Sequence, residues 1–119
     1  MSSSFFAIVF LLFNNQMHQV ILIHGAWHGS WIWNKVEHIL HHNNKSVYTP
    51  DVLFSTPEQA ANNIHEYMIN HGINDVIVCG HSYAGMIITK LADKCPERIS
   101  KLDYVDAFYS LDDNKCVYE

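Results

Sequence analysis

The fold of this chain is decided by residues 76–92, which read VIVCGHSYAGMIITKLA. The run Val76-Ile77-Val78-Cys79 is apolar and mostly β-branched, which predicts a strand buried on both faces of a parallel sheet. Apolar residues then recur at helical spacing, so we expect a helix that Cys95-Pro96 ends. A buried strand, a short turn around Ser82 and an amphipathic helix therefore follow one another directly.

The same alternation extends to both sides of this stretch. In chain order we expect a buried strand at Val20–Ile23, a helix from Ile32 to Asn43-Asn44, a short strand at Val47-Tyr48, a helix from Thr56 to His71, and a fourth strand over Leu102–Ala107. The order βαβαβαβ with short connections predicts an α/β fold with about four parallel strands and helices on both faces.

The helix that begins near Thr56 carries start and stop signals. Thr56 can cap it, Pro57 is tolerated at the first helical position, and Gln59 completes a capping-box spacing. Gly72 can adopt the left-handed conformation that ends a helix. These signals place a second crossover helix between the second and third strands.

Length and charge limit the functional classes. With 119 residues the chain is one domain at most, and 7 Lys+Arg against 12 Asp+Glu gives 7 − 12 = −5. No excess of positive charge is present to neutralise phosphates, so nucleic-acid binding is not expected. Three cysteines without close spacing suggest neither a disulfide framework nor a zinc site, and we expect a reducing, cytoplasmic location.

Nine histidines are many for this length, and His38, His41 and His42 could share one helical face. No carboxylate or cysteine stands beside them, while Asn43 and Asn44 follow. We therefore interpret them as a solvated helix end and expect no metal and no cofactor. A histidine-rich metal protein stays the last-ranked alternative.

Residues 1–16 contain an apolar run, residues 5–13, that is too short to span a bilayer. Two interpretations stay open. The segment is a poorly formed secretory signal, or Met17 is the functional start and residues 1–16 are a hydrophobic N-terminal extension upstream of it, which we favour. The domain itself is then residues 17–119.

The turn around Ser82 is the candidate chemical centre. Gly80-His81-Ser82-Tyr83-Ala84 lies between a buried strand and a helix, the context in which a G-x-S-x-G pattern forms a sharp nucleophile elbow. Small residues are needed on both sides of the serine, and Gly80 and Ala84 satisfy this, although Ala84 departs from the usual glycine. Ser82 is the predicted nucleophile, and the N–H of Tyr83 at the helix N-terminus is the predicted first oxyanion donor.

A second donor is expected from the loop after a neighbouring strand. His24-Gly25-Ala26-Trp27 occupies that place, and the Ala26 N–H is the predicted donor. A serine beside two converging N–H groups suits acyl transfer through a tetrahedral intermediate. The competing interpretation is a tight turn in which the serine only caps the helix.

Residues 20–33 (VILIHGAWHGSWIW), 79–89 (CGHSYAGMIIT) and 104–108 (YVDAF) resemble the α/β-hydrolase superfamily, in the branch of plant methyl-ester esterases and hydroxynitrile lyases. The resemblance implies a partial α/β-hydrolase fold with spatial strand order 2-1-3-4, and an esterase-like serine hydrolase acting on a small-molecule carboxylic ester. In the hydroxynitrile lyases the position that matches Gly25 is typically a threonine, so Gly25 favours the esterase side.

Two departures from the family pattern qualify this expectation. The family places its triad acid and then its histidine after the serine, whereas all nine histidines here precede Ser82. Asp106 is interpreted as structural, and neither His81 nor His24 is a convincing base. The connection from Asp51 to Ala60 is also shorter than the family's usual loop.

The chain therefore resembles an N-terminal half, a truncated α/β-hydrolase domain. The alternative function is a catalytically inactive remnant or binding module that lacks the triad Asp and His. In either case the fourth strand would be a bare edge, open to self-association or to a partner chain.

Overall fold

A computed structural model of the chain describes residues 19–26, 28–52, 56–112 and 115–118. From residue 108 onward the description covers the backbone alone. The segment that we interpreted as an N-terminal extension, residues 1–16, lies outside the described residues, and so does Met17. In the described part of the chain, no helix is both long enough and apolar enough to cross a membrane.

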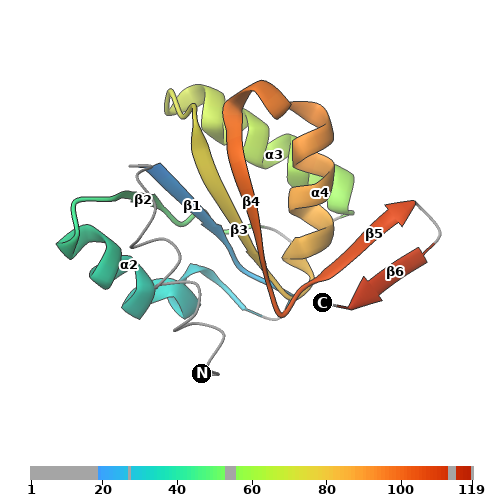
Figure 1. Cartoon of the computed structure of the whole chain (residues 1–119), viewed down its shortest axis with the longest axis horizontal. Coiled ribbons are helices and arrows are strands. Elements are labelled where there is room, and N and C mark those ends of the chain that lie inside the picture. Colours follow the sequence, from blue (N-terminus) through green and yellow to red (C-terminus); the bar gives the residue numbers. More distant parts are fainter. Residues whose placement is uncertain (1–18, 27, 53–55, 113–114, 119) are drawn as a thin grey trace.

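The centre of the fold is a four-stranded parallel sheet. Its strands are β1 (Gln19–Ile23), β2 (Ser46–Tyr48), β3 (Val76–His81) and β4 (Ile99–Val105). They lie in the order β2-β1-β3-β4 (Figure 1), which confirms the predicted order. Ile23 pairs with Gly80 and His81 pairs with Val105, so β1, β3 and β4 end at the same edge of the sheet.

Helices cover both faces of this sheet, as predicted. The 3₁₀ turn η1 (Ser30–Trp33) leads into α2 (Asn34–His42) on one face, while α3 (Pro57–Asn70) and α4 (Ala84–Lys94) pack side by side on the other (Figure 1). The strand period of two divides the core between the faces. The buried cluster on the α2 side includes Val20, Leu22, Trp33, Leu40, Ile77 and Cys79. The cluster on the side of α3 and α4 includes Ile21, Ile23, Ile64, Met68, Val78 and Ile88.

The predicted signals at the ends of α3 are present. The Gln59 N–H donates to the Thr56 hydroxyl at 3.2 Å, and Gly72 has a φ of +62°. The helix ends at Asn70, one residue before the predicted His71, which forms its C-cap. His38, His41 and His42 are exposed on α2, which agrees with a solvated helix end.

β1 and β2 each begin one residue before the predicted start, whereas the predicted ranges of β3 and β4 were wrong by two residues or more. β3 continues two residues beyond Cys79, because Gly80 and His81 still pair with β4. β4 covers Ile99–Val105 rather than Leu102–Ala107. It ends early because Asp106 has a φ of +44°, a left-handed conformation that no strand residue adopts.

A hairpin that the sequence patterns did not predict follows β4. Strands β5 (Phe108–Asp112) and β6 (Lys115–Tyr118) pair antiparallel as a separate two-stranded sheet beside α4 (Figure 1). Two runs of residues with β propensity on either side of Asp113-Asn114 were the available signal. The hairpin does not pair with β4, which is an edge strand among the described residues.

Candidate active site

The turn after β3 has the sharp geometry expected of a nucleophile elbow. β3 ends at His81, α4 begins at Ala84, and Ser82 between them has a φ of +57°. Such a φ is uncommon for a residue with a side chain and costs on the order of 1–3 kcal/mol. The Gly85 N–H donates to the Ser82 carbonyl at 3.0 Å and so starts the helix directly after the serine. A strained serine therefore stands at the N-terminal end of α4.

Gly80 makes this close strand-to-helix turn possible. A Cβ on Gly80 would lie 2.9 Å from the Ala84 carbonyl oxygen and 3.0 Å from the Ala84 carbonyl carbon. Both atoms are backbone, so they cannot move aside without shifting α4. Ala84, where the usual pattern has glycine, is fully buried and its methyl group is accommodated in the core.

His81 precedes the serine in the sequence, and its side chain packs on the α2 face of the sheet. Its ring lies 6.3 Å from the Trp33 ring, edge to face, and 6.0 Å from the His28 ring. Burial lowers the pKa of His81, His28 lowers it further, and Asp106 acts in the opposite direction. His81 is therefore neutral at neutral pH and belongs to an aromatic cluster on the α2 side.

The loop after β1 comes directly against Ser82. A Cβ built on Gly25 would lie 2.8 Å from the His81 carbonyl oxygen and 3.0 Å from the Ser82 Cβ. Gly25 is therefore needed for the two loops to approach this closely. Ala26 follows in a turn that is closed by a 3.4 Å hydrogen bond from the His28 N–H to the Gly25 carbonyl. The two loops that carry the predicted oxyanion donors, Ala26 and Tyr83, are thus in contact.

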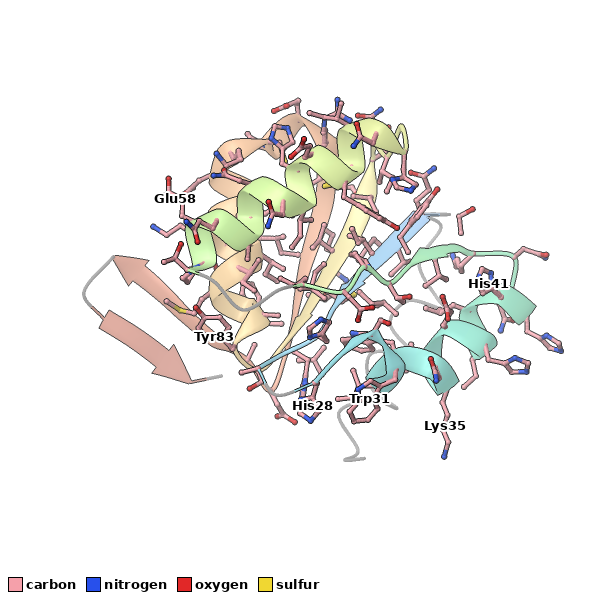
Figure 2. All side chains as sticks on the ribbon, turned by 180° about the vertical axis from the view of Figure 1, so that it is seen from behind. His28, Trp31, Lys35, His41, Glu58 and Tyr83 are labelled. Atoms are coloured by element: carbon pink, nitrogen blue, oxygen red, sulfur yellow. The ribbon has the colours of Figure 1, made fainter. Side chains whose placement is uncertain are left out.

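Figure 2 shows the same grouping from behind. The labelled side chains of His28, Trp31 and Tyr83 lie around one end of the sheet, whereas His41 lies at the far end of α2. Trp31 is 61% exposed, while Trp33 is fully buried. Trp33 therefore belongs to the core, whereas the Trp31 indole faces solvent near the candidate site.

Strand β4 supports the elbow from its other side. The Ser82 N–H donates to the Val105 carbonyl at 3.3 Å. The Thr89 hydroxyl donates to the Gly85 carbonyl at 2.8 Å, so its oxygen accepts the proton of the Tyr104 hydroxyl at 2.7 Å. These bonds tie the first turns of α4 to the end of β4. Asp106 follows directly and has a strained, left-handed backbone.

His24 links the loop after β1 to the loop after β2. Its Nε2 accepts the Val52 N–H at 2.9 Å, which leaves the ring proton on Nδ1, where it is donated to the Gly25 carbonyl at 2.9 Å. The ring is 4% exposed and its two nitrogens are both engaged. His24 therefore has a structural task here and is not directed at the Ser82 hydroxyl.

Asp51 contacts the loop after β1, and the sequence patterns did not predict this contact. Its Oδ1 accepts the Ser30 N–H at 2.7 Å and lies 3.9 Å from His24 Nε2. The only sequence signal was an aspartate directly after the Thr49-Pro50 strand end, at the edge of the sheet where ligands of α/β folds bind. A contact across 21 residues cannot be inferred from such a signal.

Groups that would complete a catalytic apparatus are not found in the described part of the chain. Among those residues the Ser82 hydroxyl makes no hydrogen bond, and no imidazole reaches it. The same residues contain no group of three or more His, Cys, Asp or Glu side chains that could hold a metal ion. The arrangement described so far is a strained serine with two neighbouring loops.

The sequence is similar to a known protein family and to several of its members. The model of a family described as "Alpha/beta hydrolase family" matches residues 20–115. The chain is 33% identical to a carbendazim hydrolyzing esterase of Nocardioides sp. (strain SG-4G), over 77% of this chain and 43% of that protein. It is 31% identical to methylesterase 2 of Arabidopsis thaliana, over 74% of this chain and 38% of that protein. It is also 31% identical to an alpha-hydroxynitrile lyase of the same plant, over 76% of this chain and 40% of that protein.

Solved structures give a similar result. An extracellular alpha/beta-hydrolase from a Paenibacillus species superposes with a TM-score of 0.75 at 29% identity, over 79% of this chain and 42% of that chain. A variant of polyneuridine aldehyde esterase superposes with a TM-score of 0.72 at 25% identity, over 84% and 44%. The chain thus spans about two-fifths of the length of the relatives that it matches.

Proposed function

The chain belongs to the alpha/beta hydrolase family, and from that premise we propose that it acts in the hydrolysis of a small-molecule carboxylic ester with Ser82 as the nucleophile. The amides of Ala26 and Tyr83 are the proposed oxyanion donors, and Gly80, His81 and Ala84 complete the proposed nucleophile elbow. The observation that carries the proposal is the approach of the Gly25 loop to a Ser82 held at a φ of +57°.

The proposed chemistry follows from these positions. The Ser82 oxygen attacks the ester carbonyl carbon and loses its proton to a base, while the carbonyl π electrons move to oxygen. The resulting O⁻ accepts hydrogen bonds from the two amides, and the intermediate then expels the alcohol, which takes up the proton. Water hydrolyses the acyl-serine by the same route, which releases the acid and restores Ser82.

The proposed reaction also needs a base that takes the proton of the Ser82 hydroxyl. An aspartate acting alone does not activate a serine without an imidazole to carry the proton. We propose that this imidazole comes from outside the described residues, by addition of another segment or of a second polypeptide. Without it, turnover should fall to the level that an oxyanion hole and binding alone provide, about 10³–10⁴-fold over water.

A fluorophosphonate ester tests the nucleophile directly, because it bonds covalently to an activated serine. With free imidazole added as the base, we expect the label on Ser82 in the wild-type chain and no label in the Ser82→Ala variant. The control is Ser100→Ala, which removes an exposed hydroxyl of β4 far from the elbow. A folded wild-type chain that takes no label even with the added imidazole, or a label on another residue, would contradict the proposed role of Ser82.

A second candidate function is a binding module without catalysis, and one observation favours it. β4 is an edge strand in the described residues, and the Ser82 hydroxyl has no imidazole partner there. An edge strand offers unpaired N–H and C=O groups to another chain. We propose pairing through β4 with a second copy or a partner chain, and light scattering that gives the mass of a monomer at all concentrations would refute self-pairing.

We also propose a cytoplasmic location. Its support is that Cys79 and Cys95 are both free and buried, and burial raises the pKa of each thiol. Thiols of this kind are inert and suit a reducing compartment. Fractionation of the source cells tests this, and recovery of the protein in the secreted fraction would contradict it.

A further inference from the structure

The loop that carries the Ala26 amide is weakly held by its own backbone. The turn over residues 25–28 is closed by a hydrogen bond of 3.4 Å, and the next bond, from the Ile32 N–H to the Gly29 carbonyl, is 3.2 Å long. The first lies beyond the usual N–H···O range of about 2.7–3.2 Å, and the second lies at its upper limit. Contacts from elsewhere in the chain must therefore fix the direction of this loop.

The shorter bonds come from the loop after β2. The Asp51 carboxylate accepts the Ser30 N–H at 2.7 Å, a distance typical of a charge-assisted hydrogen bond. This bond holds the pKa of Asp51 below its usual range, with a second contribution from the Ser30 side chain. Gly29 lies against the same carboxylate, since a Cβ there would be 3.3 Å from Oδ1. Asp51 thus fixes the far end of the loop.

His24 fixes the near end. Through Nε2 it is bonded to the Val52 N–H, and through Nδ1 to the Gly25 carbonyl, both at 2.9 Å. Asp51 and Val52 are adjacent, so the loop after β1 is attached to one short segment at both ends. Ala26 lies between these two attachment points.

We propose that Asp51 and His24 are positioning residues that hold the Ala26 N–H toward the reacting carbonyl oxygen. This inference rests on the proposed function, because it gives the Ala26 amide a task in acyl transfer. An oxyanion donor acts only when it is aimed at the place where charge develops. A displacement of about 1 Å costs about 100-fold in rate.

Asp51 is the better residue to test. Its side chain is 73% exposed, so its removal takes no packing from the core. His24 is buried, and its removal would leave the Val52 N–H without its acceptor and weaken the fold. Asp51→Ala removes the acceptor of the Ser30 N–H, whereas Asp51→Asn keeps an oxygen that can accept it. Asp93→Ala is the matched control, because it deletes an exposed carboxylate at the opposite end of α4.

The experiment measures the rate of fluorophosphonate labelling of Ser82 in these variants, together with their melting temperatures. We expect Asp51→Ala to label about 10- to 100-fold more slowly than wild type at an unchanged melting temperature. Asp51→Asn should recover most of the rate, and Asp93→Ala should label as wild type does. Equal rates for Asp51→Ala and wild type would overturn the inference and leave the role of Ser82 intact.

A wild-type chain that takes no label would instead contradict the proposed function. In that case, hydrogen exchange of the backbone amides of Ala26 and Ser30 still tests whether Asp51 holds the loop. Under the inference these amides exchange more than about 10-fold faster in Asp51→Ala than in Asp93→Ala. Equal exchange in the two variants would show that Asp51 does not hold the loop.

Discussion

The two loops in contact at the candidate site are held in place by different means. The shape of the elbow after β3 comes from its own residues, with added support from β4: Gly80 allows the turn, Ser82 takes a left-handed φ, and the helix starts two residues later. The loop after β1 has long internal hydrogen bonds and depends on Asp51 and Val52 from another part of the chain. A local sequence motif is therefore sufficient to predict the first loop and insufficient for the second.

The largest expected effect comes from breaking the elbow at Gly80. In Gly80→Ala the new methyl group meets the backbone of Ala84 at about 3 Å, so α4 must shift away from the sheet. We expect a loss of about 3 kcal/mol in the free energy of unfolding, at the upper end of overpacking effects. Urea denaturation measures it. A loss below about 1 kcal/mol would mean that the elbow tolerates a side chain at this position.

The contact between the two loops is tested by Gly25→Ala. Its methyl group would meet the His81 carbonyl and the Ser82 Cβ, and we expect a loss of about 2 kcal/mol. Gly29→Ala in the same loop is the matched control. Its methyl group would meet exposed side-chain atoms rather than backbone, Trp31 at 3.1 Å and Asp51 at 3.3 Å, so we expect a loss of less than about 0.5 kcal/mol. Urea denaturation measures both losses. Equal losses in the two variants would show that the close approach of Gly25 to His81 and Ser82 does not determine which side chains the loop tolerates.

Strain at the serine gives a smaller effect of the opposite sign. Ser82→Gly removes the strain of about 1–3 kcal/mol that the φ of +57° costs, whereas the greater freedom of the unfolded chain destabilises the variant by about 0.5–1 kcal/mol. We therefore expect a more stable protein by about 1 kcal/mol. Ser82→Ala keeps the Cβ and should show no such gain. The melting temperatures of the two variants and of the wild type check this. A Ser82→Gly variant that is less stable than the wild type would mean that the backbone of the elbow is not strained.

The smallest effect concerns the cluster of His81 with Trp33 and His28. Burial and then His28 lower the pKa of His81 from its usual 6.5 in the folded state. As the pH falls through about 6.5, the unfolded chain takes up a proton that folded His81 does not, so stability present above that pH is progressively lost below it. His81→Gln should reduce the drop in melting temperature between about pH 7.5 and about pH 5.5. The exposed His41→Gln should leave the drop unchanged, and the same drop in all three proteins would refute the effect.

Much of the fold followed from local patterns. Apolar runs such as Val20–Ile23 and Val76–Cys79 predicted buried parallel strands, and Thr56, Gln59 and Gly72 predicted the ends of α3 within one residue. The ends of β4 and the hairpin over residues 108–118 were not predicted. Ser100 and Lys101 are exposed on β4 and break its apolar pattern, and the left-handed Asp106 has no sequence signal of its own.

By itself, the sequence determined the alternation of the four parallel strands with their helices, the family and the sharp turn at Ser82, because each depends on residues close together in the chain. Only the tertiary structure decided that Gly25 lies against Ser82, that His81 faces Trp33 rather than the serine, and that Asp51 reaches the Ser30 amide. Side-chain periodicity fixes the face on which a residue lies, whereas the direction of a loop depends on hydrogen bonds to residues far away in the sequence.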